Sequence, residues 1–235
     1  DGFVGSHILE HVLENTDWDV TIICSWRQMG VAERVALVCE GREDRVRVHT
    51  HDLRAPLSDV LTEWIGEVDY IINCASESHV DRSITDPAPF IRNNVDLVTN
   101  MLEYARVAKP IAFIQISTDE VYGPAPGDTR HAEWSPIMPS NPYSASKACQ
   151  EAIAYSYWRT YGVPVIVTNT MNIIGERQDP EKYVPMIIRS VLDGETLTVH
   201  GAPGQIGSRF YLHARNQADA LLCLLNNGAE TYHAD

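Results

Sequence analysis

The sequence predicts an α/β fold in which a doubly wound parallel sheet is followed by a smaller lobe. Short apolar runs rich in Val and Ile recur along the first 170 residues, and each run is too short for a helix. Amphipathic stretches of helical length separate these runs. Strands that are apolar on both faces and alternate with helices are typical of a parallel sheet covered on both sides.

We expect five strands and four helices in this first part. The strands are "DVTIIC" (19–24), "VRVHTHD" (46–52), "VDYIINCAS" (68–76), "PIAFIQIS" (110–117) and "VPVIVTNT" (163–170), and the helices cover 5–15, 56–66, 87–108 and 143–161. Ligands of doubly wound folds bind outside the carboxyl ends of the strands. A functional site is therefore expected from the segments 24–27, 74–79, 117–123 and 169–175.

The pattern becomes less regular after residue 175. A helix over 181–193, a short strand, a Gly-rich turn and another strand are predicted there. We therefore divide the chain into a dinucleotide-binding domain at 1–175 and a partial substrate-binding lobe at 176–235. The chain is expected to be truncated at both ends, because "DGFVGSH" begins inside a glycine turn whose strand is missing and "ETYHAD" is typical of the start of a strand.

Composition excludes several classes of function. With 18 basic and 32 acidic residues, the net charge of −14 argues against a nucleic-acid partner. No apolar run approaches the roughly 18 residues that a membrane helix needs. The five cysteines show neither C-x-x-C nor metal-ligand spacing, so we expect no metal site and reduced, mostly buried thiols in a cytoplasmic protein.

The N-terminal segment contains two glycines followed at once by helical spacing. Gly2 and Gly5 match the last two glycines of a G-x-x-G-x-x-G turn, which lets the backbone approach a pyrophosphate, although an ordinary helix start is the alternative. The acidic residue that usually ends the second strand and holds the adenosine ribose is replaced by "SWR" (25–27). Arg27 would suit the 2′-phosphate of NADP, so NAD and NADP both stay open. Asp52 is either a partner of the adenine amino group or a turn residue.

"NPYSASKACQEA" places a tyrosine and a lysine on one face of a helix. Tyr143 and Lys147 are four residues apart. A phenol is a poor base at neutral pH, and a neighbouring ammonium is expected to lower its pKa by stabilising the phenolate. Lys147 can also hold a nicotinamide ribose. The spacing is common by chance, but after a strand ending in Ser-Thr it strongly indicates a functional pair.

The chain resembles the extended short-chain dehydrogenase/reductase family and, within it, the nucleotide-sugar 4,6-dehydratases of the dTDP-glucose type. The similarity is carried by "DGFVGSH" (1–7), "ASESHVDRSITDP" (75–87), "STDEVYG" (117–123), "NPYSASKA" (141–148), "YGVPVIVTNTMNIIGERQDPEKYVP" (161–185) and "GSRFYLH" (207–213). It implies a Rossmann-like fold, bound NAD, a nucleotide-diphosphate sugar as substrate, and a homodimer formed through the helices 87–108 and 143–161.

The resemblance also implies roles for the residues after the fourth strand. Glu120 would take the C5 proton of the sugar, Asp119 would protonate the departing C6 hydroxyl, and Thr118 would hydrogen-bond the C4 oxygen beside Tyr143, giving a 4-keto-6-deoxy sugar. Epimerases of the family usually carry small or hydroxyl residues at positions 119 and 120. The carboxylate pair therefore favours dehydration, and a solvated turn is the alternative interpretation of it.

Further positions are carried over from the family. The residues expected at the cofactor, besides Tyr143 and Lys147, are Gly2, Phe3, Val4, Gly5, Asp52, Leu53, Ala75, Ser76 and Asn94. Those expected at the substrate are Ser78, Asn172, Lys182 and Arg209. The segments "TNTMNIIG" and "SRFYLHARNQADAL" depart from the family's usual runs, which leaves the base and the sugar open. A C4 epimerase, a 5,6-dehydratase and a non-catalytic cofactor-binding scaffold are the alternative functions.

Overall fold

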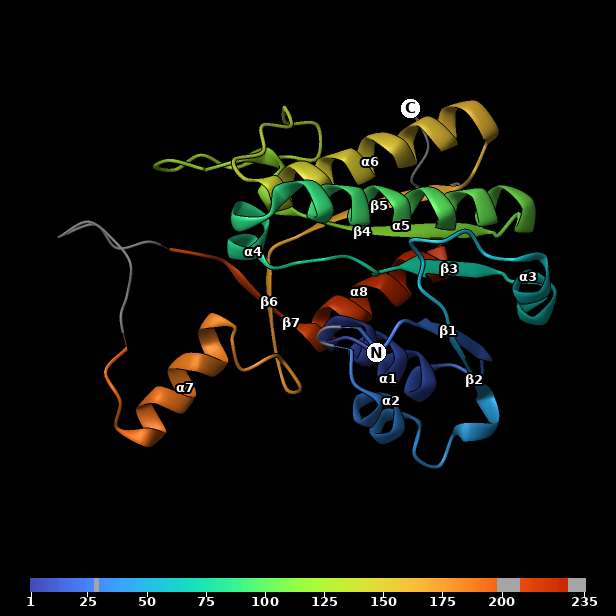
Figure 1. Ribbon diagram of the computed structural model, residues 1–235, viewed down its shortest axis with the longest axis horizontal. Helices are drawn as coiled ribbons and strands as arrows, with labels where there is room; N and C mark the ends of the chain where they lie inside the picture. Colours follow the sequence, from blue (N-terminus) through green and yellow to red (C-terminus); the bar gives the residue numbers. More distant parts are fainter. Residues whose placement is uncertain (28–29, 198–207, 228–235) are drawn as a thin grey trace. The chain divides into compact units, whose positions relative to one another are not determined.

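The computed structural model describes residues 1–27, 30–197 and 208–227 (Figure 1). The chain divides into two compact units. The first unit consists of Asp1–Thr50 and Met171–Ala220, and the second consists of His51–Thr170 and Leu221–Asp235. The two units are described one at a time below.

The first unit contains two helices on a small parallel sheet. Helix α1 (Phe3–Asn15) packs against α2 (Ala32–Cys39), and β1 (Val20–Cys24) pairs with β2 (Val46–Thr50), which follows a 3-10 turn at Glu43–Arg45. Apolar residues at helical spacing on α1 and α2 form the core of this part: Leu9, Leu13, Val35, Val38 and Cys39. The same unit holds a second parallel pair, β6 (Asn172–Ile174) with β7 (Tyr211–His213), and α7 (Tyr183–Asp193).

The second unit contains a three-stranded parallel sheet in the order β3-β4-β5. Its strands are β3 (Tyr70–Asn73), β4 (Ala112–Thr118) and β5 (Val165–Thr170), and every residue of the central strand β4 is buried. Two long helices, α5 (Pro87–Ala108) and α6 (Pro142–Tyr161), run side by side along this sheet (Figure 1). The shorter elements are α3 (Asp59–Ile65), α4 (Val80–Thr85) and a 3-10 turn, η2 (Asp119–Tyr122). Helix α8 (Ala214–Asn227) begins in the first unit and ends in the second.

The predicted fold class is confirmed, because the described strands pair in parallel and alternate with helices. Each of the five predicted strands and four predicted helices is present, with ends shifted by up to three residues. The sequence analysis missed α2, α4, β6 and α8. The Gly-rich turn and the strand expected at "ETYHAD" lie outside the described residues, and the division at residue 175 stays a prediction.

One expectation about the cysteines is wrong. Cys24 and Cys39 are buried, but Cys74, Cys149 and Cys223 are exposed. Cys74 follows the last residue of β3, and Cys149 and Cys223 lie on outward-facing positions of α6 and α8. The five thiols are therefore not mostly buried, although all five are free.

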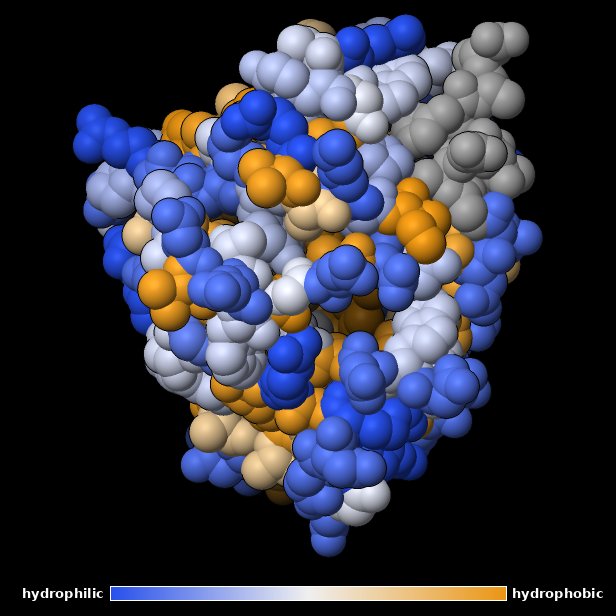
Figure 2. All heavy atoms as spheres, turned by 90° about the vertical axis from the view of Figure 1, so that its right-hand side faces the viewer, coloured by the Kyte–Doolittle hydropathy of each residue, from blue (hydrophilic) through white to orange (hydrophobic). Residues whose placement is uncertain are grey.

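One face of the molecule is largely polar. Figure 2 shows hydrophilic residues over most of the face that it presents, with apolar residues interspersed among them. Of the helices that the structure describes, none combines the length and the apolar character needed to cross a bilayer.

Candidate active site

The carboxyl end of β4 carries the two candidate carboxylates. Thr118 ends the strand, and Asp119 and Glu120 form the first turn of η2. The Thr118 hydroxyl caps this turn by accepting from the Glu120 backbone N–H (3.3 Å) and donates to Asp119 Oδ1 (3.3 Å). The buried strand and its cap therefore fix the position at which both carboxylates leave the sheet.

Helix α6 begins next to this turn and carries the tyrosine and the lysine. Asn141 is its N-cap residue, because its side chain accepts from the Ser144 backbone N–H (2.8 Å), and Pro142 occupies the first helical position. The hydroxyl of buried Ser83, on α4, accepts from the Tyr143 backbone N–H (3.1 Å). Tyr143 is thus held in the first turn of α6 by a contact from another helix.

The phenol of Tyr143 has a raised pKa. Loss of water around the ring is the main cause, and the negative charges of Glu120 and Asp119 add to it, whereas a hydrogen bond with the Thr118 side chain lowers the pKa. The sequence predicted that Lys147 lowers this pKa. That expectation is wrong for this structure, because the Lys147 charge does not contribute to the shift and its ammonium donates to the Ile116 carbonyl and to Gln150.

Lys147 lies one turn further along α6 and is buried. Its Nζ donates to the Ile116 carbonyl oxygen (2.6 Å) and to Gln150 Oε1 (2.6 Å). Burial lowers the pKa of Lys147 to about 8, and the negative charge of Glu151 partly offsets this effect. An ammonium has three N–H donors. With two of them used inside the protein, one remains for a bound hydroxyl.

A buried polar layer supports Lys147, and the sequence analysis missed it. Glu151 accepts from the Ser117 hydroxyl and from Asn169 Nδ2 (2.7 Å), and burial raises the pKa of its carboxyl. Gln150 Oε1 accepts from Gln115 Nε2 (3.2 Å) as well as from Lys147. Polar residues three and four positions after Lys147 share its helix face. This spacing is the signal that could have identified them.

The cofactor positions of the second unit differ in accessibility. Asn94 is fully buried, and its amide bonds the Glu77 backbone N–H (2.8 Å), the Glu77 carbonyl (3.1 Å) and Ser146 Oγ (2.8 Å). Its side chain therefore supports the segment after β3, where partly exposed Ala75 and Ser76 lie. The carboxylate of Asp52 pairs with Arg54 (2.6 Å), and the Leu53 side chain is buried.

The glycine turn of the first unit is open to a bound group. Gly2 is the N-cap of α1 and offers no side chain to cap it, and Phe3, Val4 and Gly5 form the first turn, which has no acidic residue. A Cβ placed on Gly2 would meet no described atom within 4 Å. Because the first N–H groups of a helix lack intrahelical partners, this turn fits the diphosphate of a dinucleotide.

The candidate substrate residues are divided between the two units, with Ser78 in the second and the other three in the first. Ser78 is exposed after β3, Asn172 begins β6, Lys182 is the N-cap of α7, and Arg209 is exposed before β7. Of the predicted site residues, Thr118, Asp119, Glu120, Tyr143 and Lys147 all belong to the second unit.

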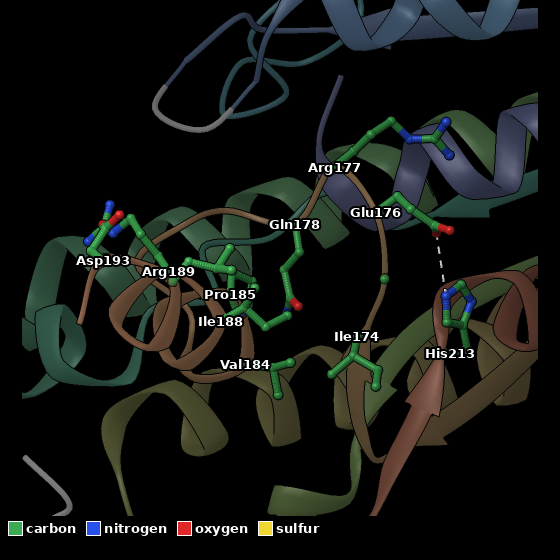
Figure 3. Close-up of a pocket in the computed structure, with 12 residues that line it drawn as sticks. Ile174, Glu176, Arg177, Gln178, Val184, Pro185, Ile188, Arg189, Asp193 and His213 are labelled. Atoms are coloured by element: carbon green, nitrogen blue, oxygen red, sulfur yellow. Dashed lines mark ion pairs between the residues drawn. The ribbon is translucent and has the colours of Figure 1, made fainter. Parts of the chain in front are cut away.

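The first unit contains a pocket of about 550 Å³. Figure 3 shows Val184, Pro185 and Ile188 of α7 on one side of this pocket. Glu176 and His213 lie on the other side, and these two residues form an ion pair of 3.4 Å. Asn172, Lys182 and Arg209 are not among the described residues that line it.

The chain is similar to curated proteins over nearly its whole length. It is 36% identical to dTDP-glucose 4,6-dehydratase 1 of Escherichia coli, with 99% of this chain and 69% of that protein covered. It is 35% identical to the low-salt glycan biosynthesis protein Agl12 of Haloferax volcanii, with 97% of this chain and 71% of that protein covered.

Solved structures have the same fold, and several of them contain NAD. One of them is the dTDP-glucose 4,6-dehydratase DesIV of Streptomyces venezuelae, solved with NAD bound, which has a TM-score of 0.86 at 33% identity. The match covers 95% of this chain and 69% of DesIV. A UDP-N-acetylglucosamine 4-epimerase of Methanobrevibacter ruminantium has a TM-score of 0.82 at 25% identity, with 94% and 69% covered. The open turn at Gly2 and the remaining Lys147 donor fit this group. NAD is the cofactor of this chain.

The family model described as the NAD dependent epimerase/dehydratase family matches residues 1–234. Its match agrees with the parallel α/β architecture and with the tyrosine and lysine one turn apart on α6. The chain therefore belongs to the NAD-dependent epimerase/dehydratase family.

Proposed function

We propose that this protein is a nucleotide-sugar 4,6-dehydratase, a hydro-lyase that converts a dTDP-glucose-like nucleotide hexose to the 4-keto-6-deoxy sugar. One observation carries the proposal: Asp119 and Glu120 leave the end of β4 in the same unit as Tyr143 and Lys147. C4 epimerisation needs only oxidation and reduction at C4. Elimination of water also needs a base for the C5 proton and an acid for the C6 hydroxyl, and two carboxyl groups can divide these tasks.

The residues that would hold NAD lie in both units. In the first unit, the turn from Gly2 to Gly5 would bind the diphosphate. In the second unit, the remaining Nζ donor of Lys147 would bind the nicotinamide ribose, and Ala75 and Ser76 would line the cofactor. When bound, NAD would supply hydride transfer, from C4 and back at C6, and its positive charge would favour the phenolate of Tyr143.

The side chains of the second unit would move the protons. Tyr143 takes the proton of the C4 hydroxyl, and Thr118 donates to the resulting C4 oxygen. Glu120 then takes the C5 proton, which the neighbouring ketone has made acidic, and Asp119 gives a proton to the departing C6 hydroxyl. When the hydride is returned at C6, Glu120 gives its proton back to C5, so that the sugar loses one water molecule without net oxidation.

The contacts to the rest of the substrate rest on the resemblance. Ser78 and Asn172 would contact the sugar nucleotide, and Lys182 and Arg209 would bind near its diphosphate. Arg209 is the stronger candidate of the two basic residues, because a guanidinium can donate two parallel hydrogen bonds to a phosphate. A homodimer through α5 and α6 and a cytoplasmic location complete the proposal.

The proposal is tested by incubating the protein and NAD with dTDP-, UDP-, GDP- and CDP-hexoses. We expect one of them to lose the mass of water and to give the NMR spectrum of a 4-keto-6-deoxy sugar. Tyr143→Phe should lose about 100-fold or more of turnover, since it removes a general base. Glu120→Gln should still oxidise C4 but dehydrate slowly.

Other results of the same experiment would overturn the proposal. A product of unchanged mass would indicate an epimerase, and NMR signals of a 5,6-ene would indicate a 5,6-dehydratase. The scaffold alternative predicts NAD binding without turnover of any of the four hexoses.

A further inference from the structure

Asn141 contacts two functional elements at once. Its Oδ1 accepts from the Ser144 backbone N–H (2.8 Å), which caps α6, and its Nδ2 donates to Glu120 Oε2 (3.2 Å). One side chain therefore joins the start of the helix that carries Tyr143 to the proposed base on η2.

The orientation of this amide is fixed by its partners. A backbone N–H can only donate, so the Asn141 atom that faces Ser144 must be the oxygen. A carboxylate oxygen can only accept, so the atom that faces Glu120 must be the nitrogen. The reversed amide would place two donors together and two acceptors together. Serine or aspartate would cap the helix as well as asparagine does, but neither offers both an acceptor and an amide donor.

The Glu120 carboxylate accepts few other hydrogen bonds. In the part of the chain that the structure describes, Asn141 is the one side chain found to donate to its carboxylate. Asp119 differs, since it accepts from the rotatable hydroxyl of Thr118. The contact from Asn141 uses Oε2 and leaves Oε1 for a substrate proton.

We propose that Asn141 is a positioning residue for the dehydration step. It holds the Glu120 carboxylate at a fixed place relative to the first turn of α6, so that the base and Tyr143 meet the same sugar in one geometry. This inference rests on the proposed 4,6-dehydratase function. Its consequence is selective: loss of the amide donor slows removal of the C5 proton and leaves oxidation at C4 unchanged.

The test uses two variants that keep the helix cap. Asn141→Ser and Asn141→Asp retain an acceptor for the Ser144 N–H but remove the amide donor to Glu120. Single-turnover measurements with NAD and the nucleotide hexose follow C4 oxidation by nicotinamide absorbance and C5 exchange in deuterated water by mass. We expect C5 exchange to slow by about tenfold to 100-fold, with C4 oxidation and KM within about twofold of the wild type.

Two controls separate positioning from helix stability. Ser58 caps α3 by accepting from the Leu61 N–H (3.2 Å), and Ser58→Ala should lower the melting temperature without changing the ratio of the two rates. In a Glu120→Gln background, Asn141→Ser should have little further effect on C5 exchange, because the base that Asn141 positions has already been removed.

The outcomes are distinguishable. If the wild-type protein dehydrates no nucleotide hexose, the proposed function fails and this inference falls with it. If the wild type is active but both Asn141 variants exchange C5 at the wild-type rate, the positioning role is wrong. It is also wrong if C4 oxidation and C5 exchange fall together, because Asn141 would then act only through the helix that holds Tyr143.

Discussion

Lys147 is a cationic group whose charge changes near physiological pH. Its pKa in the folded protein is about 8, below the usual value of 10.5, so the ammonium loses its proton as the pH rises through about 8. Burial causes this shift, and Glu151 opposes it because a negative charge favours the ammonium. The charge on Lys147 therefore depends on a carboxyl group one turn away on the same helix.

We predict that NAD affinity and turnover fall above about pH 8 and that Glu151→Gln moves this fall to lower pH. The direction follows because the substitution removes the charge that raises the pKa of Lys147. Calorimetric titration of NAD and kcat, each measured between pH 6 and about 9.5, checks the prediction. Glu67→Gln, at an exposed position, removes the same charge and should leave the profile unchanged. Identical profiles for wild type and Glu151→Gln would contradict the coupling.

The sequence indicated the reacting side chains better than the groups that support them. Tyr143 and Lys147 were predicted from a spacing of four, and Asp119 and Glu120 from their place after an apolar strand. The sequence did not predict that Lys147 bonds the Ile116 carbonyl and Gln150, or that Asn94 supports the Glu77 backbone. The Lys147–Gln150 contact spans three positions, but the other two join residues 31 and 17 positions apart, and they depend on how helices dock on the sheet.

At the scale of the elements, the C-terminal end of α1 is closed by an arginine. The Arg45 guanidinium donates to the carbonyl oxygens of Leu13 (3.1 Å), Thr16 (2.8 Å) and Trp18 (2.8 Å). The last carbonyls of a helix have no intrahelical partner, and a cation there also complements the helix dipole. Arg45 thus fixes the far end of the helix whose first turn carries Gly2 and Gly5.

We predict that Arg45→Met lowers the free energy of unfolding by about 1.5 to 3 kcal/mol, the usual contribution of hydrogen bonds to a charged group. Arg45→Lys should recover part of the loss, because a lysine keeps the charge but not the planar fork of donors. Urea unfolding followed by circular dichroism checks both values. Arg92→Met, at an exposed position of α5, should change stability by no more than about 0.5 kcal/mol. Equal losses for Arg45→Met and Arg92→Met would show that the carbonyl contacts contribute nothing.

The sequence analysis missed some of the elements, for different reasons. Helix α8 does carry a helical pattern, with Ala214, Ala218, Leu221, Leu222 and Leu225 buried, so it was overlooked although its signal was present. Helix α4 has six residues, and its one buried residue, Ser83, bonds both the Val80 carbonyl (2.6 Å) and the Tyr143 N–H. So short a helix depends on tertiary contacts, and no periodicity reveals it.

At the scale of the whole molecule, the chain combines a strong negative charge with local ion pairs. The net charge is −14, yet several acidic groups are paired, such as Glu10 with Arg177 (2.6 Å) and Glu176 with Arg215 (2.7 Å). Salt acts on the repulsion and on the pairs in opposite directions, because screening relieves repulsion among like charges and weakens attraction within pairs. The exposed pair of Glu176 with Arg215 contributes little to stability. We therefore expect the repulsion among like charges to outweigh the attraction within this pair.

We therefore predict that the melting temperature rises when NaCl is increased from about 0.01 M to 0.2 M at pH 7, a range in which the screening length falls from about 30 Å to below 10 Å. Differential scanning calorimetry of the protein measures the effect. The control is pH rather than a variant: near pH 5.0, the isoelectric point of the sequence, the repulsion vanishes and the same salt increase should leave the melting temperature unchanged or lower it. Sucrose at pH 7 is a second control, because it stabilises proteins by exclusion from their surface and does not screen charges. Comparing sucrose with NaCl therefore separates stabilisation by exclusion from stabilisation by screening. A melting temperature that falls with salt at pH 7 would mean that the attractive pairs outweigh the net repulsion, and that local pairing rather than net charge dominates the electrostatics of the chain.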